Sequence, residues 1–329
     1  MSLTLLPPTS YLLPKKNLLA FSAGIDSSAL FFLLLEHNIK FDIAIVDYGV
    51  REQSQEEVAH AKALARKHKL FCHHIKAPQF SSHFEERARK FRYEFFESLV
   101  VVEGYDTLLT AHQLNDQLEW FLMRLTKGAG VNELLGLAPL SKRENYTLVR
   151  PLLGYTKAQL LDYLHQNNLP YFVDESNRDT KYERNHFREQ FSETLLTHYK
   201  EGIARSFDYL RQDKASLEAT FERLYVKKSL HILKLHTPHS KVRATDTTLK
   251  KLGYLLSASQ RAQVAKEESL VIGGEWAIAL QENLLYIAPY LNTSMPKSFK
   301  EACRVAKIPA KIRPYLFQEE IALETMATL

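Results

Sequence analysis

A loop of small and hydroxyl side chains follows an apolar run near the start of the chain. Residues 19–21 lead into the sequence SAGIDSS, and the apolar residues 29–35 follow it. Small residues let a backbone approach an anion, and N–H groups at the start of a helix donate to phosphate oxygens. The spacing matches neither a Walker A sequence nor a GxGxxG fingerprint. We predict a phosphate-binding loop, with a capped helix after a strand as the plainer alternative; its residues are Ser22, Ala23, Gly24, Ile25, Asp26, Ser27 and Ser28.

Asp26 is the one charged residue of this loop. Hard cations that bridge phosphates prefer carboxylate oxygens, so we predict that Asp26 binds Mg²⁺.

Two further acids, Asp116 and Glu119, are three residues apart on a predicted helix that Gly128 and Gly130 close. This spacing puts both carboxylates on one helix face, just beyond the end of a predicted strand. Such a pair suits a cationic substrate; an exposed acid pair on the helix surface is the plainer alternative. His112, which precedes them, is interpreted either as a site residue or as a structural histidine at the strand end.

Arg184 and Arg188 are one helical turn apart, so both can face a single anion. A phosphate of a ligand is one such anion. Ion pairs with Glu183 or Glu189 are the alternative.

The elements that must position these residues follow an alternating pattern. Apolar β-type runs at residues 17–21, 41–46, 71–75 and 107–111 are separated by amphipathic stretches. Helices are predicted from about Ser27, from Ser54 and from Ser82, where Ser54 and Ser82 each stand three residues before a glutamate in the capping-box spacing. Four strands alternating with helices predict an α/β fold with a doubly wound, mainly parallel sheet.

The second half has a different character. Thr156 with Gln159 predicts a short helix, residues 170–181 form a polar stretch, and helical patterns run from 184 to 225. A helix is predicted over residues 249–265, followed by a hairpin with strands at 276–280 and 285–287. We therefore predict three parts: residues 1–190 as the catalytic domain, 191–225 as a helical linker, and 226–329 as a small mixed α+β domain.

Composition limits the classes of protein. The 329 residues suffice for two domains, and two cysteines without a CxxC pair build neither a zinc site nor a redox dithiol. No apolar run approaches the length of a membrane span, and the basic pair near the N-terminus follows the apolar residues instead of preceding them, so we expect a cytoplasmic protein without membrane contact. Residues 226–329 hold 15 basic and 9 acidic side chains, a charge that suits a polyanion or an ordinary surface.

The loop resembles the Ser-Gly-Gly-x-Asp-Ser motif of the PP-loop ATP pyrophosphatases. Four further segments, in the same order and with similar spacing, resemble the tRNA(Ile)-lysidine synthetase family in its shorter form. They are residues 111–119 (AHQLNDQLE), 127–130 (KGAG), 150–152 (RPL), and 174–177 (DESN) together with 184–188 (RNHFR). The resemblance covers roughly residues 17–225 and implies a PP-loop, Rossmann-like domain.

The resemblance also implies a reaction. ATP would adenylate the C2 oxygen of the cytidine at the first position of the CAU anticodon of an isoleucine tRNA, and the side-chain amine of free L-lysine would displace AMP to give lysidine. The loop, His112 and Arg184 would bind ATP, with Mg²⁺ on Asp26. Arg92 would stand near the reacting phosphate unless it is a solvated helical arginine, and Asp116 and Glu119 would hold the lysine. Contacts with the tRNA backbone are expected from Lys227, Lys228, Lys241, Arg243, Lys250 and Lys251.

Four positions depart from the family pattern. Ala23 replaces a glycine, so its Cβ would crowd phosphates or oppose a positive φ. Asn115 replaces an aspartate, and Trp120 replaces a small residue. Tyr48 stands where a histidine commonly precedes Gly49. These changes bear on affinity more than on the type of reaction.

Other functions remain as alternatives. A PP-loop tRNA thiolase also adenylates a base, but such enzymes commonly use cysteine pairs that this chain lacks. A non-catalytic tRNA-binding relative would have lost ATP turnover, and a glutamine-dependent amidotransferase would need a nucleophile that neither Cys72 nor Cys303 supplies in a suitable context. The sequence does not decide between a monomer and a homodimer.

Overall fold

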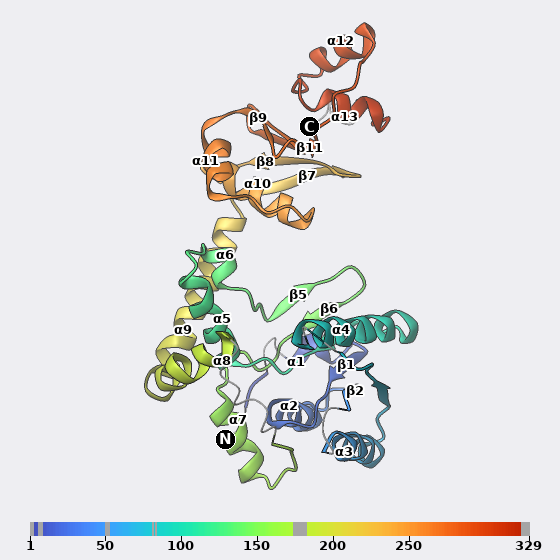
Figure 1. Cartoon of the computed structure of the whole chain (residues 1–329), viewed down its shortest axis with the longest axis vertical. Coiled ribbons are helices and arrows are strands. Elements are labelled where there is room, and N and C mark those ends of the chain that lie inside the picture. The colour runs from blue at the N-terminus through green and yellow to red at the C-terminus, as the bar shows by residue number, and fades with distance from the viewer. Residues whose placement is uncertain are drawn as a thin grey trace. The chain divides into compact units, whose positions relative to one another are not determined.

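The computed structural model describes residues 3–5, 9–49, 53–80, 82, 84–173 and 183–323. The chain divides into two compact units, Met1–Arg211 and Gln212–Leu329 (Figure 1). The expected DESN segment at residues 174–177 and Arg51 lie outside the described residues.

The N-terminal unit is built on a sheet of six strands within the described ranges, in the order β3-β2-β1-β4-β6-β5. All neighbours are parallel except the β5 and β6 pair. The predicted doubly wound α/β fold is confirmed. The strands are β1 (Asn17–Ala20), β2 (Phe41–Asp47), β3 (Cys72–Lys76), β4 (Thr107–Leu109), β5 (Leu140–Lys142) and β6 (Thr147–Val149).

The helices of this unit cover both faces of the sheet. They are α1 (Thr9–Leu12), α2 (Ile25–Glu36), α3 (Gln53–His68), α4 (Phe84–Glu103), α5 (Leu114–Leu125), α6 (Val131–Leu134), α7 (Lys157–Gln166), α8 (Glu183–Phe187), the π-helical turn η2 (Arg188–Ser192) and α9 (Glu193–Glu218), which continues past the division between the units. Successive strand residues point to opposite faces, so Leu19 and Leu109 pack with α2, while Leu18 and Leu108 pack with α4.

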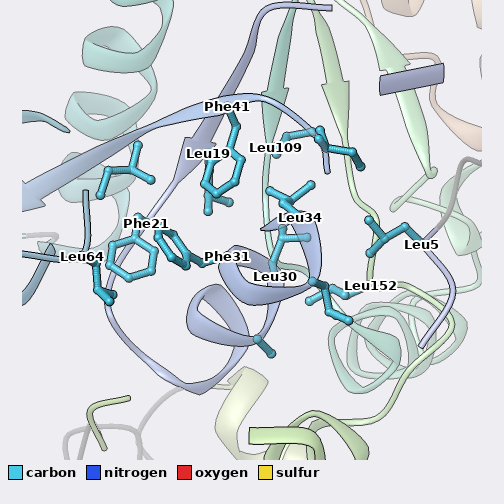
Figure 2. Packing of buried hydrophobic residues seen from close by; sticks show 14 of the residues in the cluster. Leu5, Leu19, Phe21, Leu30, Phe31, Leu34, Phe41, Leu64, Leu109 and Leu152 are labelled. Carbon is cyan, nitrogen blue, oxygen red and sulfur yellow. The ribbon is translucent and has the colours of Figure 1, made fainter. Parts of the chain in front are cut away.

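Aromatic and aliphatic side chains fill the layer between α2 and the sheet (Figure 2). Phe31 of α2 lies at its centre, with ring centroids 5.5 Å from Phe21 and 5.3 Å from Phe41. Because α2 is apolar on nearly all sides and buried, it forms a rigid support behind the loop that follows β1.

The strand order reverses between β1 and β4, because β2 and β3 extend from one side of β1 and the later strands from the other. At such a reversal the loops after the two strands diverge, and open α/β sheets bind ligands in the resulting crevice at the carboxyl ends. The fold therefore places the loop after β1 beside the segment after β4.

Several predicted boundaries need correction. The helix after β1 begins at Ile25, two residues earlier than predicted, and α3 already begins at Gln53, so Ser54 lies inside the helix and is not its cap. The cap of α7 is confirmed, because Thr156 and Gln159 form the predicted capping box. Strands β5 and β6 were not predicted.

The C-terminal unit contains, among its described residues, a five-stranded antiparallel sheet in the order β7-β8-β11-β10-β9. Its predicted hairpin is confirmed. The strands are β7 (Phe221–Lys227), β8 (Leu230–Leu235), β9 (Ser269–Ile272), β10 (Trp276–Gln281) and β11 (Leu284–Pro289), and the helices are α10 (Ser240–Lys251), α11 (Ala258–Lys266), α12 (Lys297–Val305) and α13 (Arg313–Gln318).

Two predictions for this region were wrong. Residues 221–225 belong to β7 and are not helical, because this strand pairs with β8 from Phe221 opposite Leu235 onward. The helix predicted over 249–265 is two helices, since Gly253 has a φ of +85° and Ser257 caps a new helix. Across the described parts of the chain, no helix combines the length and apolarity that crossing a bilayer requires.

Candidate active site

A cavity of about 370 Å³ lies at the carboxyl ends of β1, β2 and β4. Its walls come from the loop after β1, the residues after β2 and β4, one face of α4, the start of α7 and one residue of α8. The predicted site residues that line it are Ser22, Gly24, Ile25, Asp26, Ser27, Arg92, His112, Asp116 and Arg184. Ala23, Ser28 and Glu119 do not line it and act from behind.

The loop after β1 presents its backbone to this cavity. Gly24 is the N-cap of α2 in an extended conformation, and no side chain caps the helix. Ser22 and Ser27 hold the loop together, because the Ser22 N–H donates to Ser27 Oγ at 3.2 Å and the two hydroxyls are 3.1 Å apart. The buried Ser28 hydroxyl donates to the Ala23 carbonyl at 3.1 Å and supports the loop from below. An anion at the start of α2 would meet backbone donors and the positive end of the helix dipole.

Ala23 adopts a φ of +61°, the left-handed region that glycine favours. Its Cβ does not crowd the cavity, since Ala23 is fully buried and packs into the core behind the loop. The Phe172 N–H donates to the Ala23 carbonyl at 2.8 Å, so the chain after α7 holds this conformation in place. The alanine thus changes the backbone energy of the loop and leaves the phosphate side open.

Asp26 is the feature of the cavity that most requires a partner. Its Oδ1 atom is buried and has no hydrogen-bond partner among the described residues. The pKa of Asp26 is raised to about 7, mainly by burial and in part by the nearby carboxylates of Asp116 and Glu119, while Lys157 and Arg188 oppose the rise. A bound cation would give this oxygen a ligand and favour its charged form. The residues present therefore fit a metal ion held by one carboxylate and by oxygens of a ligand, the arrangement that Mg²⁺ often adopts with phosphates.

The two acids of α5 are paired with arginines. Arg184 donates to Asp116 and, at 2.7 Å, to Glu119 Oε2; Arg188 donates to Glu119 Oε1, also at 2.7 Å. The Glu119 side chain is 1% exposed, whereas that of Asp116 is 15% exposed and reaches the cavity. The two arginines do face one anion, as their spacing predicted, but that anion is Glu119, and the alternative pairing with Glu183 or Glu189 is not what the described geometry shows.

The two arginines lie on adjoining helical segments. Arg184 is in α8, and Arg188 begins the unpredicted π-helical turn η2, which follows α8 directly. Burial by itself lowers the pKa of Arg184, but Asp116 and Glu119 outweigh it and raise that pKa. The same acids raise the pKa of Arg188, so both guanidinium groups are held charged, and that of Arg184 lines the cavity.

Arg92 and His112 line the cavity from different elements. Arg92 extends from α4 towards Tyr48, whose hydroxyl also donates to the Ala88 carbonyl at 3.3 Å. The pKa of His112 is lowered to about 3, mainly by burial and in part by the positive charges of Arg150 and Arg184. Its Nδ1 is 2.9 Å from Thr110 Oγ1. His112 is therefore neutral at physiological pH.

The family-pattern departures have structural roles. Asn115 Oδ1 accepts the backbone N–H of Lys157 at 3.1 Å and joins α5 to α7. Trp120 Nε1 donates to the Glu133 carbonyl at 2.7 Å and lies close over Gly136. Arg150, from the RPL segment, is buried and donates to the Ala138 carbonyl at 2.7 Å, so it supports the sheet edge.

Sequence analysis did not identify Lys157, Phe172 or Arg89 as cavity residues. Lys157 comes directly after the predicted cap Thr156, and that cap is the one signal that could have drawn attention to it. Phe172 and Arg89 carry no such signal, because only the folded sheet brings them beside the loop.

Comparison with known proteins identifies the family. The family model of the PP-loop domain matches residues 8–195. The tRNA(Ile)-lysidine synthase of Wolinella succinogenes is 44% identical over 93% of this chain and 94% of its own length. The chain belongs to the tRNA(Ile)-lysidine synthase family. Relatives of the same name from Campylobacter jejuni and Helicobacter pylori are each 42% identical, over 95% and 92% of this chain and 95% and 90% of their own lengths.

A solved structure shares the fold of this lysidine synthase family member. It is the U34-tRNA thiolase NcsA from Methanococcus maripaludis with its [4Fe-4S] cluster, which has a TM-score of 0.52 and 16% identity, covering 61% of this chain and 73% of that one. At this identity the likeness supports the PP-loop fold alone.

Proposed function

We propose that the chain is an ATP-dependent ligase that forms lysidine on an isoleucine tRNA. ATP adenylates the C2 oxygen of the cytidine at the first position of the CAU anticodon, and the side-chain amine of L-lysine displaces AMP. One observation carries the proposal: the phosphate loop after β1 and Asp116 after β4 line the same cavity, in a chain whose relatives over nearly their whole length are named tRNA(Ile)-lysidine synthase.

The phosphate loop supplies the donors for ATP. Backbone N–H groups at the start of α2 bind phosphate oxygens, and Asp26 holds Mg²⁺, which when bound offsets charge on the pyrophosphate leaving group. Arg92 faces the same cavity from α4 and stabilises negative charge that develops at the reacting phosphate. His112, being neutral, offers a hydrogen bond without adding charge.

The two acids have different roles in this proposal. Asp116 reaches the cavity and meets the cationic amine of lysine, in exchange for part of its contact with the half-exposed Arg184. Glu119 is a positioning residue, because it is buried and anchors both Arg184 and Arg188. The sequence analysis expected both acids to hold the lysine; in this proposal only Asp116 contacts it.

The contacts with tRNA are proposed for the C-terminal unit, but not for all of the expected lysines. Lys228 pairs with Glu319 at 2.5 Å, Lys250 pairs with Asp246 at 3.0 Å, and Lys241 is buried with its ammonium on the Glu267 carbonyl at 2.6 Å. Lys227 and Lys251 are exposed and remain suited to phosphate contact. Binding through such contacts weakens as salt rises.

A tRNA thiolase is less well supported. The chain has two cysteines, Cys72 and Cys303; both are free, and they belong to different compact units. Cysteine pairs of the kind that hold a cluster or deliver sulfur are therefore not available from this chain.

The deciding experiment measures incorporation of radiolabelled lysine into isoleucine tRNA with a CAU anticodon, in the presence of ATP and Mg²⁺. Methionine tRNA, with the same unmodified anticodon, is the control. The proposal requires selective, ATP-dependent labelling with release of AMP and pyrophosphate. AMP formation without labelling would indicate another nucleophile, and tRNA binding without AMP would indicate a non-catalytic relative.

Asp26→Asn tests the role of the metal-binding carboxylate. We expect pyrophosphate release to fall by at least about a hundredfold, because removing one element of transition-state charge stabilisation commonly costs that much. Binding of tRNA, measured by filter retention, should stay within about twofold of wild type. Pyrophosphate release at the wild-type rate would contradict the assignment of Asp26.

A further inference from the structure

Lys157 lines the proposed ATP cavity, although the sequence analysis did not single it out as a site residue. It is the first residue of α7, an element that neither the phosphate loop nor the acid pair belongs to. We propose that Lys157 is a further ATP-binding residue whose ammonium contacts the triphosphate, and that the Asn115 side chain positions it. This inference rests on the proposed use of ATP.

The backbone of Lys157 is fixed from two directions. On its own helix, Thr156 Oγ1 accepts the Gln159 N–H at 3.3 Å, and Gln159 Oε1 accepts the Thr156 N–H at 3.0 Å. From the neighbouring helix, Asn115 Oδ1 accepts the N–H of Lys157 itself at 3.1 Å. The start of α7 is thereby held against the start of α5, and a second bond does the same, from the Leu114 N–H to the Tyr155 carbonyl at 2.8 Å.

Lys157 differs from the arginines that line the cavity in the partners of its charged group. Arg184 is paired with Asp116 and Glu119, Arg89 lies 5.1 Å from the centre of the Tyr93 ring, and Arg92 lies beside Tyr48. Among the described residues, the Lys157 ammonium has no hydrogen bond or ion pair. A lysine whose backbone is held in place and whose ammonium has no protein partner is suited to bind an anionic ligand.

The position of Asp26 indicates where a triphosphate would lie. Asp26 and Lys157 line the same cavity, Asp26 from the start of α2 and Lys157 from the start of α7. The two side chains nonetheless form no ion pair, and Asp26 Oδ1 remains without a partner among the described residues. A triphosphate between them satisfies both, with a metal ion on the Asp26 side and a phosphate oxygen on the Lys157 ammonium.

Asn115 explains why the cation stands where it does. This residue departs from the aspartate of the family pattern, and its one described side-chain contact is with the backbone of Lys157. It therefore acts as a positioning residue through Lys157 and not as a ligand of the metal or of lysine.

The test compares Lys157→Met with wild type, with Lys157→Arg as the conservative variant and Lys142→Met as the matched control. Lys142 is exposed on β5 and does not line the cavity. Loss of one charge-assisted contact predicts that Lys157→Met binds Mg²⁺-ATP about tenfold or more weakly by calorimetry, with the same increase in the KM for ATP. The KM for lysine should not change, Lys157→Arg should lose less than Lys157→Met, and Lys142→Met should match wild type.

A double-mutant cycle tests the positioning role. Asn115→Ala should raise the KM for ATP in the wild-type background but add little in the Lys157→Met background, because both changes act on one contact. Asn115→Asp should restore the wild-type value, since a carboxylate oxygen accepts the same N–H. Additive effects, or a loss that Asn115→Asp does not restore, would overturn this part of the inference.

The two levels of proposal fail in different ways. If wild-type protein binds ATP but labels no tRNA with lysine, the proposed function fails and the ATP titrations still decide the role of Lys157. If wild type makes lysidine and Lys157→Met binds ATP as tightly as Lys142→Met does, the inference about Lys157 is wrong and the function stands.

Discussion

Ala23 places an L-residue where the phosphate loop turns with a positive φ. The left-handed region costs an L-residue roughly 1–2 kcal/mol, so the conformation must be held by its surroundings. The hydrogen bonds from Phe172 and from Ser28 to the Ala23 carbonyl provide that hold. The loop thus carries local strain that the family's usual glycine would not have.

The strain predicts opposite effects for one chemical change at two places. Ala23→Gly should raise the free energy of unfolding by about 0.5–1 kcal/mol, whereas Ala29→Gly, inside α2, should lower it by about 1 kcal/mol. Urea unfolding of both variants measures the difference. A shift of the same sign in both would show that the positive φ of Ala23 is not a source of strain.

His112 predicts a pH dependence of stability. Its pKa is about 3 in the folded chain, against about 6.5 when unfolded. Below pH 6.5 the unfolded state therefore binds a proton that the folded state does not, and stability falls as the pH falls from 6.5 towards 3. When the pH is lowered from 7.5 to 5, the unfolding free energy of wild type should fall by about 1–2 kcal/mol more than that of His112→Gln. The exposed His198→Gln is the control, and identical pH profiles for wild type and His112→Gln would refute the prediction.

At the scale of elements, the strand–helix alternation was sufficient to predict the parallel sheet, and the loop positions followed from it. Strands β5 and β6 were not predicted, because neither lies in a β-type run as long as residues 107–111, the run that predicted the equally short β4. The helix predicted over 221–225 was wrong because pairing with β8 outweighs the local pattern there. The spacing of Arg184 and Arg188 was sufficient to predict that both can face one anion, but only the folded chain shows that this anion is Glu119.

The packing of α5 against the segment after α6 predicts that any side chain at Gly136 destabilises the fold. A Cβ added there would stand 2.1 Å from Trp120 Nε1, far inside contact distance. Gly136→Ala should therefore cost about 1–3 kcal/mol in unfolding free energy, the usual range for overpacking. Gly202→Ala, in α9 with nothing near its added Cβ, should instead stabilise by up to about 1 kcal/mol.

The cause is checked by making space on the other side of the contact. In a Trp120→Ala background, Gly136→Ala should lose most of its cost, because the clashing ring is gone. If Gly136→Ala still lowers the unfolding free energy as much in that background, its effect comes from the backbone and not from the contact with Trp120.

At the scale of the whole molecule, the positive charge of residues 226–329 predicts how tRNA affinity responds to salt. Replacing Lys227 and Lys251 together by alanine should weaken tRNA binding and reduce the slope of log affinity against log salt by about 1 to 2, since each phosphate contact contributes roughly 0.7 to 0.9. Replacing Lys228 and Lys250, which are paired with Glu319 and Asp246, should change the slope less. An unchanged slope for the first pair would place the tRNA contacts elsewhere.

Each compact unit contains one cysteine, so the rate at which its thiol is labelled can report how often that unit opens locally. Cys303 is fully buried among the helices and strands of the C-terminal unit, while Cys72 is half-buried at the start of β3. A thiol reagent reaches Cys303 only when its surroundings open, so its rate of labelling reports the local opening of that unit without any introduced mutation. Read together by mass spectrometry, the two rates would follow the opening of both halves in one native sample, with and without ATP or tRNA.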